Sequence, residues 1–398
     1  MGLVSNNILY NIKASPTLMA EARANELKVQ GYPVISLCTG EPDFDTPENI
    51  KLAAIEAINQ GYTKYTPAGG FKDLKEAIIN KFKRENNIDY ALNEVCASSG
   101  AKQVIYNALM ASLNPGDEVI IPVPYWVSYP EMVKIAGGKP IILESNDFSL
   151  DVKKIEKAIT SKTKWLMINS PNNPSGIVYS YEKLRELADM LLKYEHVYIL
   201  SDDIYEHLIY DNAKFHTLAA VEPELKNRIL TVNGFSKTYA MTGWRLGYAG
   251  GPAELIKAMS TIQTQSTSSP CSISQKAGVA ALNGSQDFVV KSREIFKSRR
   301  NMVYEYINKI TGLKCDMPEG AFYIFIDCSG LFGKKTPKGS VLHTSNDVVA
   351  YWLDQVYLAV VDGAPFGAEG YLRISYATSD ANLLEACKRM KEACEILC

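Results

Sequence analysis

A lysine with a hydroxyl neighbour and a nearby arginine is the feature of this sequence best suited to chemistry. Lys237 follows Ser236 after an apolar run, and Arg245 comes eight residues later. The hydroxyl and the guanidinium supply a neutral donor and a permanent cation, which together suit a phosphate dianion. An amine held beside such a phosphate can condense with an aldehyde. The alternative, a solvated surface lysine, describes most lysines but does not explain these neighbours.

A carboxylate and a phenol follow a second apolar run. In HVYILSDDIYEHL, Asp202 lies at the predicted end of a buried strand, and Tyr205 comes three residues later. Open α/β sheets bind their ligands at the carboxyl ends of strands. Asp202 is either a helix cap or a carboxylate that faces a bound ligand. Adjacent Asp203 is interpreted as a structural cap.

These two segments carry a resemblance to a known family. The stretch GFSKTYAMTGWRLGY, residues 234–248, is similar to the cofactor-lysine signature of class I aminotransferases, within fold type I of the pyridoxal-phosphate (PLP) enzymes. The resemblance covers essentially the whole chain and is strongest to the bacterial aspartate/prephenate aminotransferase group. It implies PLP held by Lys237 as a Schiff base, with Asp202 facing the pyridine nitrogen and Tyr205 donating to the phenolic oxygen.

Further cofactor contacts follow from the same resemblance. Asn173, in SPNNPSG, matches the asparagine that bonds the phenolic oxygen, although the segment alone predicts only a turn. The helix opened by residues 99–101 offers free backbone N–H groups to the phosphate, unless Gly100 is a simple turn residue. Trp126 matches the aromatic residue that stacks on the ring, or else belongs to the core. The whole predicted cofactor set is Tyr65, Ser99, Gly100, Ala101, Trp126, Asn173, Asp202, Tyr205, Ser236, Lys237 and Arg245.

Tyr65, in YTKYTPAGG, bears on the oligomeric state. In the family the matching tyrosine reaches the phosphate of the neighbouring subunit. The resemblance therefore implies a homodimer whose active sites are shared between subunits, and an inactive monomer.

An arginine in an apolar run is the predicted substrate anchor. Arg373 lies in EGYLRISYAT, and a buried guanidinium without a partner would be costly. The resemblance implies that Arg373 binds the α-carboxylate of the substrate, with Gly40, Trp126 and Asn173 around it. A purely structural ion pair is the alternative.

The residue for a second substrate carboxylate is left open. Animal and enteric aspartate enzymes use a second arginine, but residues 261–275 contain none. The lysine that some bacterial relatives carry in the helix after the phosphate loop aligns with Met110. Lys13, in NIKASPT, matches an N-terminal lysine associated with prephenate use, and its alternative is a mobile tail lysine.

The elements that position these residues follow from short β-branched runs alternating with helical periods. This pattern is typical of a mostly parallel sheet flanked by helices, an α/β fold. Strands are predicted at residues 118–123, 139–143, 164–168, 196–201, 228–232 and 245–249. Helices are predicted at 47–60, 102–113, 181–193 and 252–262, the first with Thr46 as its N-cap and with Ile58 on its packed face.

The chain is long enough for two domains. Residues 47–285 are predicted to form a large PLP-binding domain and 286–398 a smaller α+β domain, with helices at 287–309 and from Asp380. Residues 1–46 are predicted to form an arm and then join the small domain, which is thus built from both chain ends.

Composition and net charge limit the classes of partner that we expect. With 42 basic and 44 acidic residues the net charge is −2, so we expect no nucleic-acid or anionic-lipid partner. Because ~18 consecutive apolar residues are needed to span a membrane and no such run exists, we expect no membrane segment. The eight cysteines show no metal-ligand spacing with the four histidines, so reduced thiols, a cytoplasmic location and no metal are expected.

The predicted function is transfer of the amino group of L-aspartate to 2-oxoglutarate, which forms oxaloacetate and L-glutamate by a ping-pong mechanism. Lys237, Asp202 and Tyr205 are the predicted catalytic residues, with Lys237 moving the α-proton. Conversion of prephenate to arogenate is a second activity of the same group. The alternatives are an aromatic or alanine aminotransferase, a β-eliminating lyase and a non-catalytic PLP-sensing domain.

Overall fold

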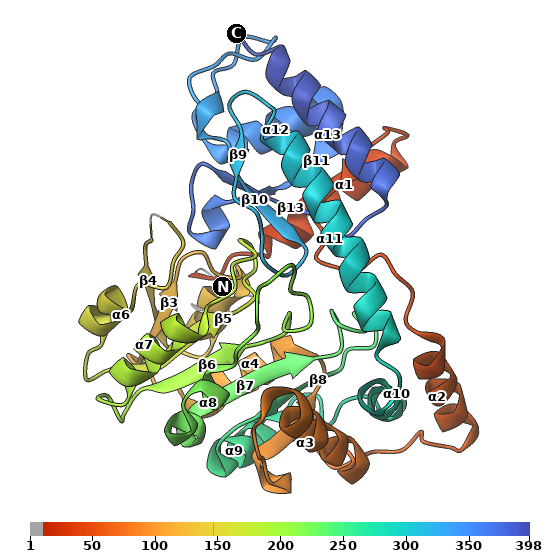
Figure 1. Cartoon of the computed structure of the whole chain (residues 1–398), viewed down its shortest axis with the longest axis vertical. Helices are drawn as coiled ribbons and strands as arrows, with labels where there is room; N and C mark the ends of the chain where they lie inside the picture. Colours follow the sequence, from red (N-terminus) through yellow and green to blue (C-terminus); the bar gives the residue numbers. More distant parts are fainter. Residues whose placement is uncertain (1–10, 146) are drawn as a thin grey trace, which may run out of the picture.

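A seven-stranded sheet forms the framework of the middle of the chain (Figure 1). The computed structural model describes residues 11–145 and 147–398. The strands lie in the order β2-β8-β7-β6-β5-β3-β4, and β8 runs antiparallel to both of its neighbours while the other pairs are parallel. Their bounds are β2 (Val95–Ser98), β3 (Glu118–Pro122), β4 (Lys139–Leu143), β5 (Thr163–Asn169), β6 (Tyr198–Asp202), β7 (Ile229–Gly234) and β8 (Gly247–Gly250). The mostly parallel sheet expected from the sequence is therefore present.

Helices cover both faces of this sheet. In β5, Trp165 and Met167 enter one buried cluster while Leu166 and Ile168 enter another, because successive side chains of a strand point to opposite faces. The first face is covered by α4 (Ala101–Ser112), α5 (Ser128–Ile135) and α9 (Ala253–Thr264). The second packs with α2 (Glu48–Asn59), α3 (Lys72–Asn86), α6 (Val152–Ala158), α7 (Tyr181–Leu191), α8 (Leu218–Val221) and α10 (Ser272–Asn283).

A smaller antiparallel sheet organises the C-terminal part. Its order is β12-β13-β10-β9, with β9 (Lys314–Cys315), β10 (Tyr323–Asp327), β12 (Val361–Asp362) and β13 (Tyr371–Ser375). Three helices accompany it, namely α11 (Asp287–Ile307), α12 (Ser345–Val356) and α13 (Asp380–Glu395). Figure 1 shows the long α11 running from the larger body up to this part.

The beginning of the described chain packs against its end. The two-residue strand β1 (Ile35–Ser36) pairs in parallel with β11 (Leu358–Ala359), and α1 (Pro16–Val29) contacts β1, β11 and β12. In Figure 1 the red α1 accordingly lies among the blue C-terminal elements. The domain boundaries at residues 46 and 285 stay a prediction. Among the described residues, no helix is long and apolar enough to cross a membrane.

The predicted capping role of Thr46 is wrong. Helix α2 begins at Glu48 with Pro47 at its N-cap and without a side-chain cap. The Thr46 hydroxyl instead donates to the Ala240 carbonyl at 2.7 Å and accepts from Trp244 Nε1 at 3.0 Å. Because its hydrogen bonds go to the loop between Lys237 and Arg245, Thr46 fastens the N-terminal segment to that loop.

Candidate active site

A cavity of about 370 Å³ opens where the two parts of the chain meet. Its floor lies at the carboxyl ends of the neighbouring strands β5, β6 and β7, the edge at which parallel sheets bind ligands. The small sheet contributes Tyr323 and Arg373 to the opposite wall. The predicted site residues that line the cavity are Gly40, Ala101, Trp126, Asn173, Asp202, Tyr205, Ser236, Lys237, Arg245 and Arg373.

The Lys237 amine projects into this cavity from the loop that follows β7. Its Nζ donates to the carbonyl oxygen of Gly40. The pKa of Lys237 is lowered to about 8, mainly by burial and also by the charges of Arg373 and Arg245, while the charge of Glu41 opposes the shift. A substantial fraction of the amine is therefore neutral near physiological pH, which is the form that attacks a carbonyl.

Asp202 is the last residue of β6 and is 5 % exposed. Its Oδ2 accepts from the Tyr129 hydroxyl at 2.6 Å, and its Oδ1 accepts from the Ile204 amide at 3.3 Å. Burial raises the pKa of Asp202 to about 6 although both hydrogen bonds and the Lys237 charge oppose this. Asp202 also lines the cavity, and a buried carboxylate there can accept from a ligand N–H. Adjacent Asp203 is also buried, but its carboxylate accepts from Ser201 Oγ at 2.7 Å.

Two phenols stand beside the amine. The hydroxyls of Tyr205 and Tyr323 lie 2.8 Å apart. Burial raises the pKa of Tyr205 well above its ordinary value, so the phenol stays protonated and able to donate. Gly40 is needed here because a Cβ at position 40 would collide with the Tyr323 hydroxyl.

An anion cradle forms at the start of α4. Gly100 is the N-cap with φ +90°, and a Cβ at this position would collide with the guanidinium of Arg245. The backbone of Arg245 is itself left-handed, with φ +51°, and its Nη1 donates to the Thr242 carbonyl at 2.8 Å. The first amides of a helix lack partners within the helix and attract anions. Helix terminus, guanidinium and the Ser236 hydroxyl thus supply the donors that a phosphate requires.

Arg373 is a buried cation in β13 and is 2 % exposed. Its Nη1 donates to Asn173 Oδ1 at 3.2 Å and its Nη2 donates to the Cys38 carbonyl, while its Nε has no partner among the described residues. The guanidinium lies over the rings of Tyr323 and Phe366. Among the described residues no acidic side chain forms an ion pair with Arg373. Because the buried Arg373 cation has only neutral partners, a negatively charged ligand would stabilise it.

Comparisons with known proteins identify the family. The family model described as aminotransferase class I and II matches residues 32–390. This chain belongs to the class I and II aminotransferases. A probable aspartate/prephenate aminotransferase of Rickettsia typhi is 53% identical, and the match covers 100% of both chains. An aspartate aminotransferase of Rhizobium meliloti is 54% identical over 98% of this chain and 96% of its own length.

Solved aminotransferase structures agree with the fold. The crystal structure of the aspartate aminotransferase from Rhizobium meliloti has a TM-score of 0.97 at 52% identity and covers 100% of both chains. The Thermus thermophilus aspartate aminotransferase with maleate has a TM-score of 0.92 at 42% identity over 99% of this chain and 100% of its own. The family and the fold type I α/β architecture inferred from the sequence are thereby confirmed.

Four predicted residues lie outside the lining of this aminotransferase cavity. Ser99 and Gly100 stand behind Ala101, and the Ser99 amide donates to Gln103 Oε1 at 2.7 Å. Tyr65 is 92 % exposed on the surface. Lys13 is also exposed, and it lines a neighbouring cavity of about 470 Å³ that shares Ser15 with the first. The cofactor and substrate roles of all these residues stay predictions.

Sequence reasoning missed several lining residues. Lys102 projects into the cavity, with its Nζ 4.8 Å from the centre of the Trp126 ring, whereas Met110 does not line it. Burial and the charge of Arg245 lower the pKa of Lys102. Tyr129 follows Trp126 by one helical turn in PYWVSYP, a spacing that offered a signal. For Tyr323 the sequence offered none, because its contact with Tyr205 spans 118 residues.

Proposed function

We propose that this aminotransferase uses PLP in the central cavity to move the amino group of L-aspartate to 2-oxoglutarate by a ping-pong mechanism. The observation that carries the proposal is a single cavity lined by Lys237, whose pKa is lowered to about 8, by the buried Asp202 carboxylate and by Arg373. An amine, a carboxylate and a guanidinium in one cavity are the groups that an amino-acid transaminase needs.

The cavity residues fit PLP group by group. When bound, PLP supplies an aldehyde and an electron-withdrawing pyridine ring. In this proposal Lys237 Nζ holds the aldehyde carbon, and the phosphate takes the first turn of α4 with Ser236 and Arg245. The Asp202 carboxylate would receive the ring N–H, and Trp126 would pack on the ring. Tyr205 and Asn173 hydrogen-bond the phenolic oxygen.

Proton transfer falls to Lys237. A base works best when its pKa lies near the working pH, and burial brings the pKa of Lys237 to about 8. We propose that Nζ, once the amine of the amino acid has taken its place on the aldehyde carbon, removes the α-proton and delivers it to the carbon that receives the amino group. The Gly40 carbonyl, which accepts from Nζ, keeps the amine oriented between transfers. Tyr205 remains protonated throughout because burial keeps its pKa high.

Two cations are assigned to the substrate carboxylates. Arg373 binds the α-carboxylate with its planar fork, since Asn173 and the Cys38 carbonyl already fix the guanidinium. Lys102 is the remaining cation in the lining and binds the distal carboxylate of aspartate. The relatives named aspartate aminotransferase support this choice, as does the Thermus thermophilus structure with maleate, a four-carbon dicarboxylate.

Prephenate is proposed as a second substrate on narrower grounds. Relatives at 53% identity are named probable aspartate/prephenate aminotransferases. Lys13 lines the neighbouring cavity of about 470 Å³, and Ser15 lines both cavities. A substrate long enough to extend past Ser15 would therefore contact the Lys13 amine.

We further propose a homodimer with shared active sites. Tyr65 is 92 % exposed, and the outer side of nearby α2 exposes Leu52, Ile55 and Ile58 by more than half. Contiguous apolar side chains of this kind mark association surfaces, and a second copy is the usual partner. On this arrangement Tyr65 would reach the phosphate site of the neighbouring subunit.

A half-reaction panel tests the proposal. Purified protein loaded with PLP is mixed separately with aspartate, glutamate, alanine and tyrosine, and the cofactor's absorbance is followed. We expect aspartate and glutamate to react fastest and no net ammonia release. Response to alanine or tyrosine without any response to aspartate would contradict the substrate, and stoichiometric ammonia release would favour an eliminating lyase.

A variant pair tests the lysine. Lys237→Ala should lose both transamination and cofactor that borohydride fixes to the chain, because no other amine holds the aldehyde. The control is Lys183→Ala, at a partly exposed lysine on α7, and this variant should retain both. Cofactor still fixed by borohydride in Lys237→Ala would refute the assignment.

A further inference from the structure

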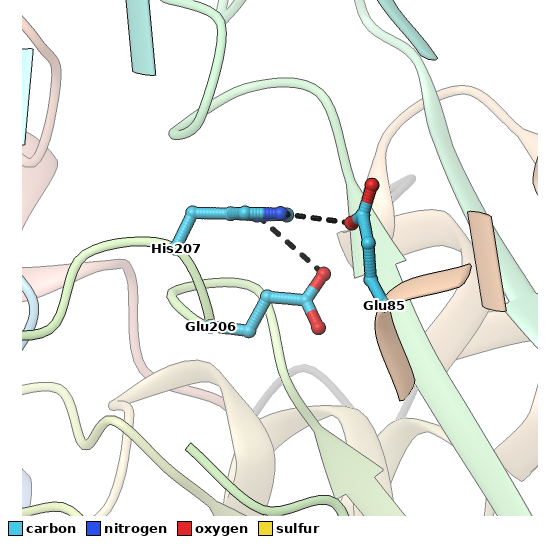
Figure 2. A group of neighbouring side chains, drawn as sticks. All are labelled: Glu85, Glu206 and His207. Carbon is cyan, nitrogen blue, oxygen red and sulfur yellow. Dashed lines mark hydrogen bonds and ion pairs between the residues drawn. The ribbon is translucent and has the colours of Figure 1, made fainter. Parts of the chain in front are cut away.

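A buried carboxylate network lies directly behind the proposed active site. Glu206 follows Tyr205 in the chain, is 5 % exposed and does not line the cavity. Figure 2 shows the His207 ring facing the carboxylates of both Glu85 and Glu206. His207 Nε2 lies 3.0 Å from Glu85 Oε2, and Nδ1 lies 3.5 Å from Glu206 Oε1.

Hydrogen bonds already use the Glu206 carboxylate fully. The three side chains of Figure 2 are close enough together to surround an ion. However, Oε1 of Glu206 accepts from Lys81 Nζ and from Asn233 Nδ2 at 2.8 Å, and Oε2 accepts from Asn86 Nδ2 at 2.7 Å. Lys81 is 0 % exposed, so its ammonium is the cation that neutralises this carboxylate. The cluster is therefore a satisfied hydrogen-bond network.

This network joins the two segments that carry the proposed chemistry. Glu206 belongs to the turn that begins at Asp202, and its amide donates to the Asp203 carbonyl at 2.9 Å. Asn233 lies in β7 four residues before Lys237, and its Oδ1 accepts from the Gly234 amide at 2.7 Å. Glu206 thus adds a side-chain link between the turn carrying Asp202 and the strand leading to Lys237, beyond the backbone pairing of β6 with β7.

The same carboxylate bonds both segments to a third element. Lys81 and Asn86 belong to α3, which packs outside the sheet. Thr238, next to Lys237, adds a second link because its hydroxyl lies 3.2 Å from His207 Nδ1. A helix that takes no part in the cavity thereby holds the two segments from behind.

We propose that Glu206 is a positioning residue that, through Lys81 and Asn233, fixes the turn carrying Asp202 and Tyr205 relative to the strand end that carries Lys237. This inference rests on the proposed function and assigns a role to a group outside the cavity. Burial raises the pKa of Glu206, but the charges of Lys81 and His207 and the hydrogen bonds from Lys81 and Asn86 outweigh it, so the carboxylate is ionised at working pH.

The expected effect follows from geometry. Displacing reacting groups by about 1 Å can cost on the order of a hundredfold in rate. Glu206→Gln keeps the shape of the side chain but leaves the buried Lys81 ammonium with only the Glu85 carboxylate, 3.6 Å away, as a counter-charge. The turn and the strand then lose the charged side-chain link through Glu206 and keep only their backbone pairing, while Arg373 is untouched.

The test compares Glu206→Gln with Glu85→Gln, both loaded with PLP. Glu85 lies in the same cluster and contacts His207 and Lys81, but it makes no hydrogen bond to β7. Glu206→Gln should lower kcat by about 10- to 100-fold with KM for the amino acid within about twofold. It should also shift the pH midpoint of the cofactor's visible absorbance by more than about half a pH unit, because the surroundings of Lys237 change. Glu85→Gln should change neither quantity.

A second variant keeps the inference testable if Glu206→Gln does not fold. Asn233→Ala preserves the Lys81–Glu206 pair but removes the link to β7, and it should shift the absorbance midpoint in the same way. If these variants melt at lower temperature yet keep the wild-type midpoint and kcat, the network is merely structural and the positioning role is refuted. A wild-type protein without a PLP absorbance band would instead refute the proposed function.

Discussion

Replacing Asp202 by asparagine should stabilise the cofactor-free protein while destroying its use of PLP. The carboxylate is buried, and its partners Tyr129 and Ile204 are neutral donors. Burial therefore raises the pKa of Asp202 from its ordinary value of 3.8 to about 6. An ionised carboxylate in this position costs stability until a ligand N–H neutralises it.

The magnitude follows from the two pKa values. Because the folded pKa lies above the unfolded one, the cost is absent well below pH 4, grows between about pH 4 and 6 and is complete above pH 6. At 1.36 kcal/mol for each pKa unit the cost is about 3 kcal/mol at pH 8, and about 1.6 kcal/mol at pH 5. Asparagine removes the charge but gives up one acceptor, which costs about 1 kcal/mol. Asp202→Asn should therefore raise the free energy of unfolding by about 2 kcal/mol at pH 8 and by about 0.5 kcal/mol at pH 5.

The assay is urea unfolding of cofactor-free protein, wild type and Asp202→Asn, at pH 8 and pH 5. The decisive quantity is the increase in unfolding free energy caused by Asp202→Asn at pH 8 minus the increase at pH 5. The cost of the lost hydrogen bond is the same at both pH values and cancels in this difference. Asp211→Asn is the matched control, since Lys297 and Arg300 lower the pKa of Asp211 and both pH values lie above it. That variant should lose stability about equally at both pH values. Equal gains for Asp202→Asn at pH 5 and pH 8, or a loss at pH 8, would refute the reasoning.

Other predictions follow from the same site. Capture of PLP by cofactor-free protein should speed up as the pH rises through about 8 and then level off, because neutral Lys237 is the reacting form; a rise continuing to pH 10 would contradict this. Arg373→Lys should raise KM for every amino acid by at least about tenfold, since a lysine loses the two-point grip. Lys102→Ala should raise KM for aspartate but leave alanine unchanged, and equal effects on both would remove its assignment. Mixing inactive Tyr65→Ala and Lys237→Ala subunits should restore part of the activity if sites are shared, whereas no recovery would argue against a shared site.

Much of the sheet was predictable because strand signals are local. The predicted strand 139–143 coincides with β4, and 118–123 exceeds β3 by one residue. The shared location of Asp202 and Lys237 was also predictable, because Asp202 ends β6 and Lys237 follows β7. Neighbouring parallel strands bring such residues together at one edge, whatever the loops between them.

The features that the sequence did not predict depend on contacts between residues far apart in the chain. Arg245 was predicted to begin a strand, but its backbone is left-handed and β8 starts at Gly247, because the guanidinium turns toward Gly100. Ile58 was predicted to lie on the packed face of α2, yet it is 53 % exposed. The bond between Glu206 and Lys81 spans 125 residues, and no local pattern announces such a pair.

The pairing of β1 with β11 has a consequence for protein synthesis. Strand β1 is translated more than 300 residues before its partner β11. Domains generally fold as units while synthesis proceeds, so the sheet that carries Lys237 can assemble before β11 exists. The cavity wall that contains Gly40 and Arg373 has to wait until β13 has been synthesised. A nascent chain stalled near residue 285 should therefore resist protease across its central sheet while residues 11–46 are cut.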